Sequence, residues 1–299
     1  MNRKILYLIN PISGTLRKAS LQKIIAEKTR EQKIHFEIYS ADKDGKYLYL
    51  KEKIKKDKIT DVVICGGDGT VNQVAAALLG VNVNIGIIPA GSGNGLAFAA
   101  KIPKPTARAL QIIFNGRSEY IDAFYINDHF SCMLCGIGFD AQVAHDFSLE
   151  KKRGLVTYVK RSMINFLKAT PYQFDINIKD RSFSTEAFFI SVANSNQFGN
   201  NFTIAPKASL NDGLLDIIVV RKMSKLKLIW AVLQQIRFGQ VWESEEINFY
   251  KKEVLYFQTD RLSIHNPMMA PLHIDGEPAT TNKRFSIKIL PAAFKLLQP

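Results

Sequence analysis

The chain has 299 residues, of which 46% are hydrophobic and 22% are charged. This composition excludes an intrinsically disordered protein and is sufficient for one large domain or two ordinary ones. Lys and Arg number 40 against 27 Asp and Glu, so the formal net charge is +13. A basic chain favours polyanionic partners such as phosphorylated ligands, nucleic acid or anionic membranes, although charge alone does not choose among them.

The cysteine count and the hydropathy pattern indicate a cytoplasmic protein. The three cysteines, Cys65, Cys132 and Cys135, are too few for a disulfide framework. Cys132 and Cys135 form a single C-x-x-C without a second ligand pair, so a zinc site is not expected. The first apolar run, residues 5–9, is too short for a signal peptide, and no run approaches the length of about 18 residues that a membrane span needs. A protein of this kind that acts on lipids would be peripheral at the membrane.

The first third of the chain alternates between strands and helices. Short apolar runs predict buried strands, and the segments between them have helical spacing. We expect strands at residues 4–9, 34–39, 61–65 and 85–88, and helices at residues 16–33, 43–58, 71–79 and 96–101. Repeated strand–helix units predict a parallel sheet that is wrapped by helices.

From about residue 120 the pattern changes to consecutive strands. We expect strands at residues 120–126, 130–136, 174–178, 183–193, 214–220, 254–260, 262–265 and 285–290, with helices at residues 142–169 and 225–238. Many consecutive strands favour an antiparallel sandwich. The expected fold class is therefore α/β, with an N-terminal parallel-sheet nucleotide-binding domain (residues 1–122) and a C-terminal antiparallel β-sandwich substrate domain (residues 123–284).

Glycine-rich loops follow three of the four expected parallel strands. Their sequences are NPISG at residues 10–14, GGDGT at residues 66–70 and GSGNG at residues 91–95. Ligands of open parallel sheets bind at the carboxyl ends of strands, where glycine permits close backbone approach and helix N-termini present N–H groups. The sequence therefore predicts a polyphosphate site. The loops match neither a Walker A motif nor the dinucleotide-binding fingerprint.

Asp68 lies inside the second glycine loop. A carboxylate there would repel phosphate unless a cation lies between them, and Mg²⁺ commonly binds one or two carboxylates together with phosphate oxygens. The structural alternative is a helix N-cap, a role that Asp favours. Thr70 could cap equally well, so capping does not require Asp68, and we expect a magnesium ligand.

A second acidic group occurs in the sequence HIDGE at residues 273–277. If this segment is a strand, His273, Asp275 and Glu277 lie on one face. A carboxylate within hydrogen-bond reach of an alcohol can accept its proton during phosphoryl transfer. Asp275 or Glu277 is therefore a candidate general base, and an acidic turn before Pro278 is the structural alternative.

Together these motifs resemble those of the diacylglycerol kinase catalytic-domain family, which includes bacterial lipid kinases, sphingosine kinases and ceramide kinases. The resemblance rests on GGDGTVN, PAGSGN, NPISG and DGE, which begin at residues 66, 89, 10 and 275. The GGDG sequence alone also occurs in NAD kinases and phosphofructokinases. The resemblance implies an N-terminal domain with a phosphofructokinase-like or NAD kinase-like fold, a β-sandwich domain, and a last segment, residues 285–299, that returns to the first domain.

The resemblance also implies site residues, position by position. Asp68 would hold Mg²⁺ with Asp122, a second Mg²⁺ site would use Ser209, Asp212 and Leu214, and Asp275 or Glu277 would be the base. ATP would be bound by a set in the three loops and at the end of the second strand: Asn10, Pro11, Ser13, Gly14, Ser40, Gly66, Gly67, Asp68, Gly69, Thr70, Asn72, Gly91, Ser92, Gly93 and Asn94.

These motifs predict an ATP-dependent lipid kinase that phosphorylates a hydroxyl of diacylglycerol or of a sphingoid base, in transient contact with an anionic membrane. Gly95 stands where several bacterial diacylglycerol kinases have Asp, so the third loop resembles the sphingosine and ceramide kinase version. One alternative is an NAD kinase-like or other soluble-alcohol kinase, and another is a non-catalytic nucleotide or nucleic-acid binder. Nucleic acid is not expected, because aromatic and basic residues do not alternate on strands. A homodimer is left open.

Overall fold

The computed structural model describes residues 3–11, 18–42, 44–148, 169–179, 181–197, 205–224 and 253–299. Its contacts divide the chain into two compact units, Met1–Asp122 with Pro291–Pro299 (unit 1) and Ala123–Leu290 (unit 2). Two strands, β5 (Arg117–Ile126) and β15 (Arg284–Gln298), contribute residues to both units. The C-terminal segment of unit 1 begins at Pro291 in this division, whereas the sequence placed its start at residue 285.

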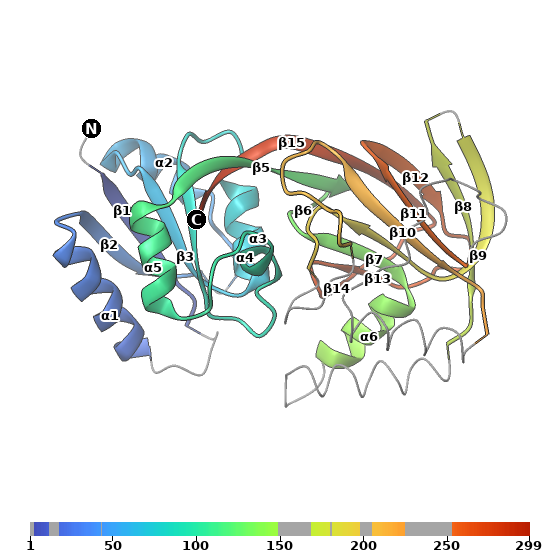
Figure 1. Cartoon of the computed structure of the whole chain (residues 1–299), viewed down its shortest axis with the longest axis horizontal. Coiled ribbons are helices and arrows are strands. Elements are labelled where there is room, and N and C mark those ends of the chain that lie inside the picture. The colour runs from blue at the N-terminus through green and yellow to red at the C-terminus, as the bar shows by residue number, and fades with distance from the viewer. Residues whose placement is uncertain are drawn as a thin grey trace. The chain divides into compact units, whose positions relative to one another are not determined.

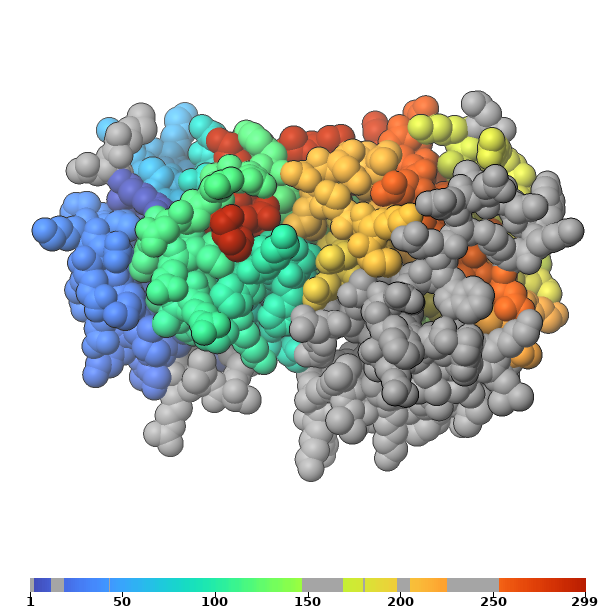
Figure 2. Space-filling model, viewed as in Figure 1, coloured from blue at the N-terminus to red at the C-terminus, as the bar shows by residue number. Residues whose placement is uncertain are grey.

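Unit 1 contains a parallel sheet in the order β2-β1-β3-β4-β15. Strands β1, β3 and β4 are buried along almost their whole length, because helices cover a parallel sheet on its faces. Figure 2 shows the C-terminal end of the chain, in dark red, among green residues of the same unit. The strand bounds are β1 (Lys4–Ile9), β2 (His35–Ser40), β3 (Asp61–Gly66) and β4 (Asn84–Pro89).

The helices of unit 1 follow the strands in alternation, and Figure 1 shows α1 and α5 side by side in front of the sheet. Their bounds are α1 (Lys18–Glu31), α2 (Tyr49–Asp57), α3 (Asp68–Ala77), α4 (Gly95–Ala99) and α5 (Thr106–Asn115). The sequence prediction missed α5, which buries Ala109, Leu110 and Ile113 along one face. The alternation of parallel strands with helices agrees with the predicted α/β domain.

Helix α2 begins at Tyr49, so the expectation of a helix from residue 43 is wrong. The residues before α2 form a turn in which Asp44 N–H donates to Asp42 Oδ1 at 2.7 Å. Gly45 has a φ of +73°, which is incompatible with a right-handed helix. An Asp side chain that binds the backbone two residues later favours a turn over a helix start, despite the lysine-rich sequence that follows.

Unit 2 is built from antiparallel strands in the order β14-β13-β7-β9-β8-β12-β15, with β10 pairing to both β9 and β11, and β5 pairing to β6. Helix α6 (Phe139–Ser148) follows β7. The remaining bounds are β6 (His129–Ser131), β7 (Leu134–Gly138), β8 (Tyr172–Ile178), β9 (Arg181–Ala193), β10 (Leu215–Arg221), β11 (Val254–Thr259), β12 (Arg261–His265), β13 (Leu272–Ile274) and β14 (Glu277–Ala279).

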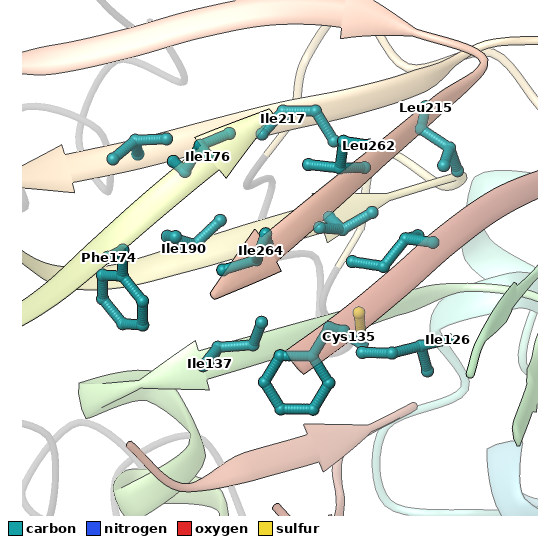
Figure 3. Packing of buried hydrophobic residues seen from close by; sticks show 14 of the residues in the cluster. Ile126, Cys135, Ile137, Phe174, Ile176, Ile190, Leu215, Ile217, Leu262 and Ile264 are labelled. Carbon is teal, nitrogen blue, oxygen red and sulfur yellow. The ribbon is translucent and has the colours of Figure 1, made fainter. Parts of the chain in front are cut away.

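The core of unit 2 is formed by alternate side chains of these strands. Figure 3 shows Phe174, Ile176, Ile190, Ile217 and Ile264 gathered in one apolar cluster. Most of these strands, such as β8, β10 and β12, contribute every second residue to this cluster, which is the arrangement that a sandwich-like antiparallel sheet requires. The predicted fold class, a parallel α/β region followed by an antiparallel β-sandwich-like region, is confirmed.

Several predicted boundaries in unit 2 differ from the structure. The expected strand at residues 130–136 is two strands, β6 and β7, and the hairpin of β13 and β14 was not expected. The helix expected from residue 142 begins at Phe139; its continuation beyond residue 148 and the helix expected at residues 225–238 lie outside the described residues. Among the helices that are described, none is long and apolar enough to cross a membrane.

Candidate active site

The carboxyl ends of β1, β3 and β4 carry the three glycine loops, and the described parts of these loops contact one another. Asn10 Nδ2 donates to Thr70 Oγ1 at 2.7 Å, which links the first loop to the second. A Cβ atom added to Gly91 would lie 2.5 Å from the Cα of Gly67, so the second and third loops touch through their backbones. Glycine is required at this contact because any side chain would separate the loops.

Asn94 holds the third loop in shape. Its backbone is left-handed, with a φ of 57°, a conformation that Asn tolerates better than most residues. Asn94 Oδ1 accepts the Gly91 N–H at 2.8 Å, and Asn94 Nδ2 donates to the Gly91 carbonyl at 2.8 Å. The side chain is buried and closes the loop on itself, while Ser92 at the tip is exposed. A direct contact between Asn94 and a nucleotide stays a prediction.

Asp68 is the first residue of α3, and the N-cap of that helix is Gly67. The capping alternative for Asp68 is therefore wrong. A Cβ atom on Gly93 would lie 2.8 Å from Asp68 Oδ2, so the carboxylate lies against the third loop. A half-buried carboxylate at a helix N-terminus between two such loops fits a magnesium ligand that shares the ion with phosphate and water.

The chain around Asp68 does not provide a complete set of metal ligands by itself. No group of three or more His, Cys, Asp or Glu side chains that could hold a metal ion occurs in the described part of the chain. An ion at Asp68 would therefore depend on phosphate oxygens for most of its coordination, as Mg²⁺ in kinases commonly does. Metal binding at this position would therefore be linked to nucleotide binding.

The other predicted nucleotide residues occupy the same edge of unit 1 where they are described. Pro11 follows β1, Ser40 is the exposed last residue of β2, and Asn72 lies in the first turns of α3. Ser13 and Gly14 lie outside the described residues. The position of Ser40 agrees with the carboxyl-end rule for parallel sheets.

Asp122 is buried in β5, and its observed contact is with the C-terminal segment. Its Oδ1 accepts the Ala292 N–H at 2.7 Å. This hydrogen bond joins β5 to the residues that begin the C-terminal part of unit 1. The role of Asp122 as a magnesium ligand stays a prediction.

The predicted second magnesium site lies in the turn that precedes β10. Leu214 N–H donates to Asp212 Oδ1 at 3.0 Å, and Ser209 Oγ donates to Asn211 Oδ1 at 3.0 Å. Gly213 has a φ of +73°, so the chain bends sharply between Asp212 and Leu214. This short segment offers an exposed carboxylate and several backbone carbonyls, and oxygen donors of this kind suit a hard cation.

Asp216 is a fully buried carboxylate two residues after this turn, and no sequence motif indicated its role. Asp216 Oδ1 accepts hydrogen bonds from the Tyr256 hydroxyl and from Gln258 Nε2, whereas Asp216 Oδ2 has no hydrogen-bond partner among the described residues. Burial raises the pKa of Asp216 to about 6, and the negative charge of Asp212 contributes. An unsatisfied carboxylate oxygen beside Asp212 fits a cation at this turn.

The DGE segment of unit 2 is a turn rather than part of one strand. Asp275 and Gly276 join β13 to β14 with φ values of 49° and 84°. Two residues with positive φ are typical of a type I′ hairpin turn, for which Asp-Gly is a preferred sequence. The expectation that His273, Asp275 and Glu277 share one strand face is therefore wrong, because the chain reverses at Asp275.

The two acidic candidates in this turn have different environments. Asp275 is buried, and its Oδ1 accepts the Ser131 hydroxyl at 2.6 Å and the N–H groups of Leu134 at 3.0 Å and Met133 at 3.2 Å. The side chain of Glu277 is exposed and makes no hydrogen bond or ion pair in the described part of the chain. The carboxylate of Asp275 therefore holds the connection between β6 and β7, whereas that of Glu277 is accessible.

Comparison with known proteins identifies the family. Residues 4–126 match the family model of the diacylglycerol kinase catalytic domain, and residues 134–298 match that of the YegS C-terminal NAD kinase beta sandwich-like domain. The chain belongs to the diacylglycerol kinase catalytic-domain family. Membership in this family makes it a lipid kinase, a phosphotransferase with an alcohol acceptor.

Family relatives match most of the chain. A "Probable lipid kinase YegS-like" protein of Pectobacterium atrosepticum is 32% identical over 258 residues, which cover 84% of this chain and 82% of the relative. A protein of the same description from Shewanella frigidimarina is 30% identical over 250 residues, which cover 81% and 78%.

Solved structures of the family share the fold. A crystal structure of a diacylglycerol kinase from Bacillus anthracis str. Sterne has a TM-score of 0.74 at 17% identity, and a second structure from that strain has a TM-score of 0.81 at 18% identity. Each comparison covers 99% of this chain and 97% of the other.

Proposed function

We propose that this family member uses ATP and Mg²⁺ to phosphorylate a hydroxyl group of a membrane lipid such as diacylglycerol or a sphingoid base. The observation that carries the proposal is the contact of the glycine loops with one another and with Asp68. Backbone N–H groups of such loops suit the phosphates of a nucleotide, and the carboxylate suits the metal that accompanies them. The names of the relatives support the lipid acceptor, and Gly95 is the reason to keep a sphingoid base as a candidate.

In this proposal unit 1 supplies the nucleotide and metal residues. Asp68 would hold the ion, and the loops that contain Gly67 and Gly91 would present N–H groups to the phosphates. Bound Mg²⁺ would neutralise charge on the phosphate oxygens. The chain itself orients the phosphates, since helix α3 directs its N-terminal dipole towards the same loop edge.

Unit 2 would supply the general base, and the environments of the two candidates favour Glu277. A base must reach the acceptor hydroxyl, and the exposed Glu277 carboxylate has no competing partner in the described part of the chain. Asp275 is engaged by Ser131 and by the backbone of Met133 and Leu134, so it would position the turn rather than take the proton.

Contact with an anionic membrane is the other part of the proposal. The acceptor is a lipid, and the net charge of +13 would attract the chain to anionic headgroups. Attraction of this kind weakens with salt, because charges at a surface are screened over about 10 Å at 0.1 M ionic strength. Activity on anionic vesicles should therefore decrease as salt is added.

The test is transfer of label from γ-labelled ATP to defined acceptors. We expect labelled product with vesicles that contain diacylglycerol or a sphingoid base, and none with NAD. Asp68→Ala should lower turnover at least about 10³-fold while the thermal melting profile is kept. Asp128→Ala, an exposed carboxylate outside the loops, is the matched control. Label in NAD alone would support a soluble-alcohol kinase, and salt-sensitive RNA binding without ATP turnover would support a non-catalytic binder.

A further inference from the structure

Asp140 and His273 form a buried pair next to the Asp275–Gly276 turn. His273 is fully buried in β13, and Asp140 is buried in the first turn of α6. Asp140 Oδ1 accepts the Ala141 N–H at 2.8 Å, but its buried Oδ2 makes no hydrogen bond in the described part of the chain. His273 Nε2 lies 3.5 Å from that Oδ2. A buried carboxylate oxygen is costly without a partner, so this edge of the imidazole is expected to present an N–H to it.

The other nitrogen of the same imidazole contacts the turn. The Gly276 N–H donates to His273 Nδ1 at 3.4 Å. An imidazole nitrogen accepts a hydrogen bond only when it carries no proton, so a neutral His273 has its proton on Nε2. Nε2 is the nitrogen that faces Asp140. The contacts of the two nitrogens therefore require the same tautomer, and the carboxylate on one side selects it.

Gly136 provides the space for this pair. His273 lies opposite Gly136 in the pairing of β13 with β7. A Cβ atom at Gly136 would overlap both Asp140 Oδ2 and His273 Nε2, although the backbone φ of Gly136 is not positive. The absence of a side chain at this position is therefore explained by the buried pair and not by backbone conformation.

The turn requires support from outside the hairpin. Strands β13 and β14 have three residues each, and a hairpin of that size is not stable by itself. Asp275 has a left-handed backbone, which costs on the order of 1 kcal/mol for a residue other than glycine. Glu277 directly follows the turn, so any shift of Gly276 moves Glu277 with it.

We infer that Asp140 and His273 are positioning residues for catalysis. Asp140 selects the imidazole tautomer with the proton on Nε2, and the unprotonated Nδ1 of His273 then accepts the Gly276 N–H and holds the turn that places Glu277. The effect on turnover rests on the proposed function, in which Glu277 is the base. The tautomer and the hydrogen bond do not rest on it, because they belong to the folded chain alone.

The first experiment measures the tautomer directly in the full chain. Nitrogen-15 NMR of protein labelled at its five histidines should show His273 with the proton on Nε2. Asp140→Asn presents an amide that can donate to Nε2, so the proton should move to Nδ1, as expected when the carboxylate partner of an imidazole becomes an amide. A proton on Nδ1 in the unchanged protein, or the same tautomer in both proteins, would overturn the inference.

The second experiment measures turnover in variants of the pair. Asp140→Asn and His273→Gln should lower kcat by about 10- to 100-fold, because a small displacement of a reacting group has effects of this size. The KM for ATP should not change. His273→Asn keeps an acceptor near the position of Nδ1 and should retain more activity than His273→Gln. Wild-type kcat in both Asp140→Asn and His273→Gln would contradict the proposal, as would equal losses in the two His273 variants.

His265→Gln is the matched control. His265 Nδ1 lies 2.9 Å from Asp175 Oδ2 in the same unit, so this change also removes an Asp–His contact, but one between β12 and β8, which do not carry the turn. It should leave kcat unchanged, and a loss equal to that of His273→Gln would indicate a general structural effect.

If the wild-type protein phosphorylates no lipid, the proposed function fails, while the NMR experiment still decides the tautomer.

Discussion

At the scale of single residues, burial and hydrogen bonding distinguish two acidic residues that lie close together in the sequence. Asp275 and Glu277 are two residues apart, yet one carboxylate is buried among N–H and O–H donors and the other is exposed. A carboxylate that already accepts three hydrogen bonds stabilises the fold and has little capacity for a substrate. Residue identity alone therefore could not distinguish a buried structural acid from an accessible one.

Substitution of the two carboxylates should separate stability from turnover. We expect Glu277→Gln to lower kcat by about 10²- to 10⁴-fold, as for loss of a general base, with an unchanged melting temperature because Glu277 is exposed. Asp275→Asn should cost about 1–3 kcal/mol of unfolding free energy, because an amide group replaces one of the accepting oxygens. Lipid kinase assays and thermal melts measure both effects. If Glu277→Gln keeps wild-type turnover, Glu277 is not the base.

At the scale of elements, the loops that follow β1, β3 and β4 are held together by a side-chain hydrogen bond and by close backbone contact. Asn10 and Thr70 join the first loop to the second, and Gly67 and Gly91 join the second loop to the third. Adjacent parallel strands have their carboxyl ends at the same edge of the sheet, so the loops that follow them lie close together. The glycines then allow the loops to approach to a distance that side chains would prevent.

Two glycine variants should distinguish contact between loops from contact with ligand. Gly91→Ala should reduce both the melting temperature and the affinity for ATP, with a cost of about 1–3 kcal/mol in stability, because its Cβ would meet the backbone of Gly67. A Cβ atom added at Gly69 would have no other atom within 4 Å. Gly69→Ala should therefore leave stability unchanged and lower only ATP affinity. Thermal melts and titration calorimetry with ATP test this. Equal stability of the two variants would contradict the proposed contact.

A cluster of charges attaches the edge strand β2 to its neighbours. Glu37 in β2 lies 2.8 Å from Lys4 Nζ in β1 and 2.7 Å from Lys53 Nζ in α2. Hydrogen bonds from Lys4 and Lys53 lower the pKa of Glu37 from its ordinary value of 4.5 to about 2. A lowered pKa means that the folded state binds this proton more weakly than the unfolded state, so the contribution of Glu37 to stability is present above about pH 4.5 and is lost as the pH falls towards 2.

The lowered pKa of Glu37 predicts how the effect of Glu37→Gln on stability depends on pH. Since the cluster is partly exposed, we expect the variant to lose about 1 kcal/mol of unfolding free energy at pH 7. The difference from the wild type should shrink as the pH is lowered below about 4.5. Urea denaturation at several pH values measures it, and Glu119→Gln, an exposed carboxylate without an ion pair among the described residues, is the control. A difference that grows on acidification would contradict the prediction.

On the scale of the whole molecule, the C-terminal residues belong to the same unit as the first strands. Lys295 and Leu296 of β15 pair with Asn84 and Ile85 of β4, and Leu296 is fully buried. The parallel sheet that carries the glycine loops therefore includes the last residues of the chain. The sheet that carries the loops therefore depends for its packing on residues that are more than 190 positions away from the loops.

Leu296→Ala should therefore weaken nucleotide binding without touching a site residue. The cavity should cost about 2–5 kcal/mol of unfolding free energy, and ATP binding should be lost at a lower temperature than in the wild type. Leu262→Ala removes the same atoms from the core of unit 2 and should lower that temperature less. ATP titrations at increasing temperature compare the two variants. An equal effect of both would show that the two units unfold together.

The sequence was sufficient for features that depend on local periodicity and on the ends of strands. The alternation of β1 to β4 with helices predicted the parallel sheet, and the glycines of residues 66–70 and 91–95 predicted loops at one edge. The sequence was insufficient where the signal for a turn competed with the pattern of a helix or a strand. The turn at Asp42 and Gly45 shortened α2, and the Asp-Gly pair that closes the β13–β14 hairpin was interpreted as part of a strand.

The contacts between distant residues were decided only by the tertiary structure. Asp140 meets His273, and Ser131 meets Asp275, although more than 130 positions separate the members of each pair. No spacing or composition indicates such a pair in a single sequence, because burial and hydrogen bonding depend on which strands become neighbours. The sequence by itself determined the chemistry that is available to this lipid kinase. The packing of the sheets determined which of its carboxylates are buried and hydrogen-bonded within the fold and which remain exposed.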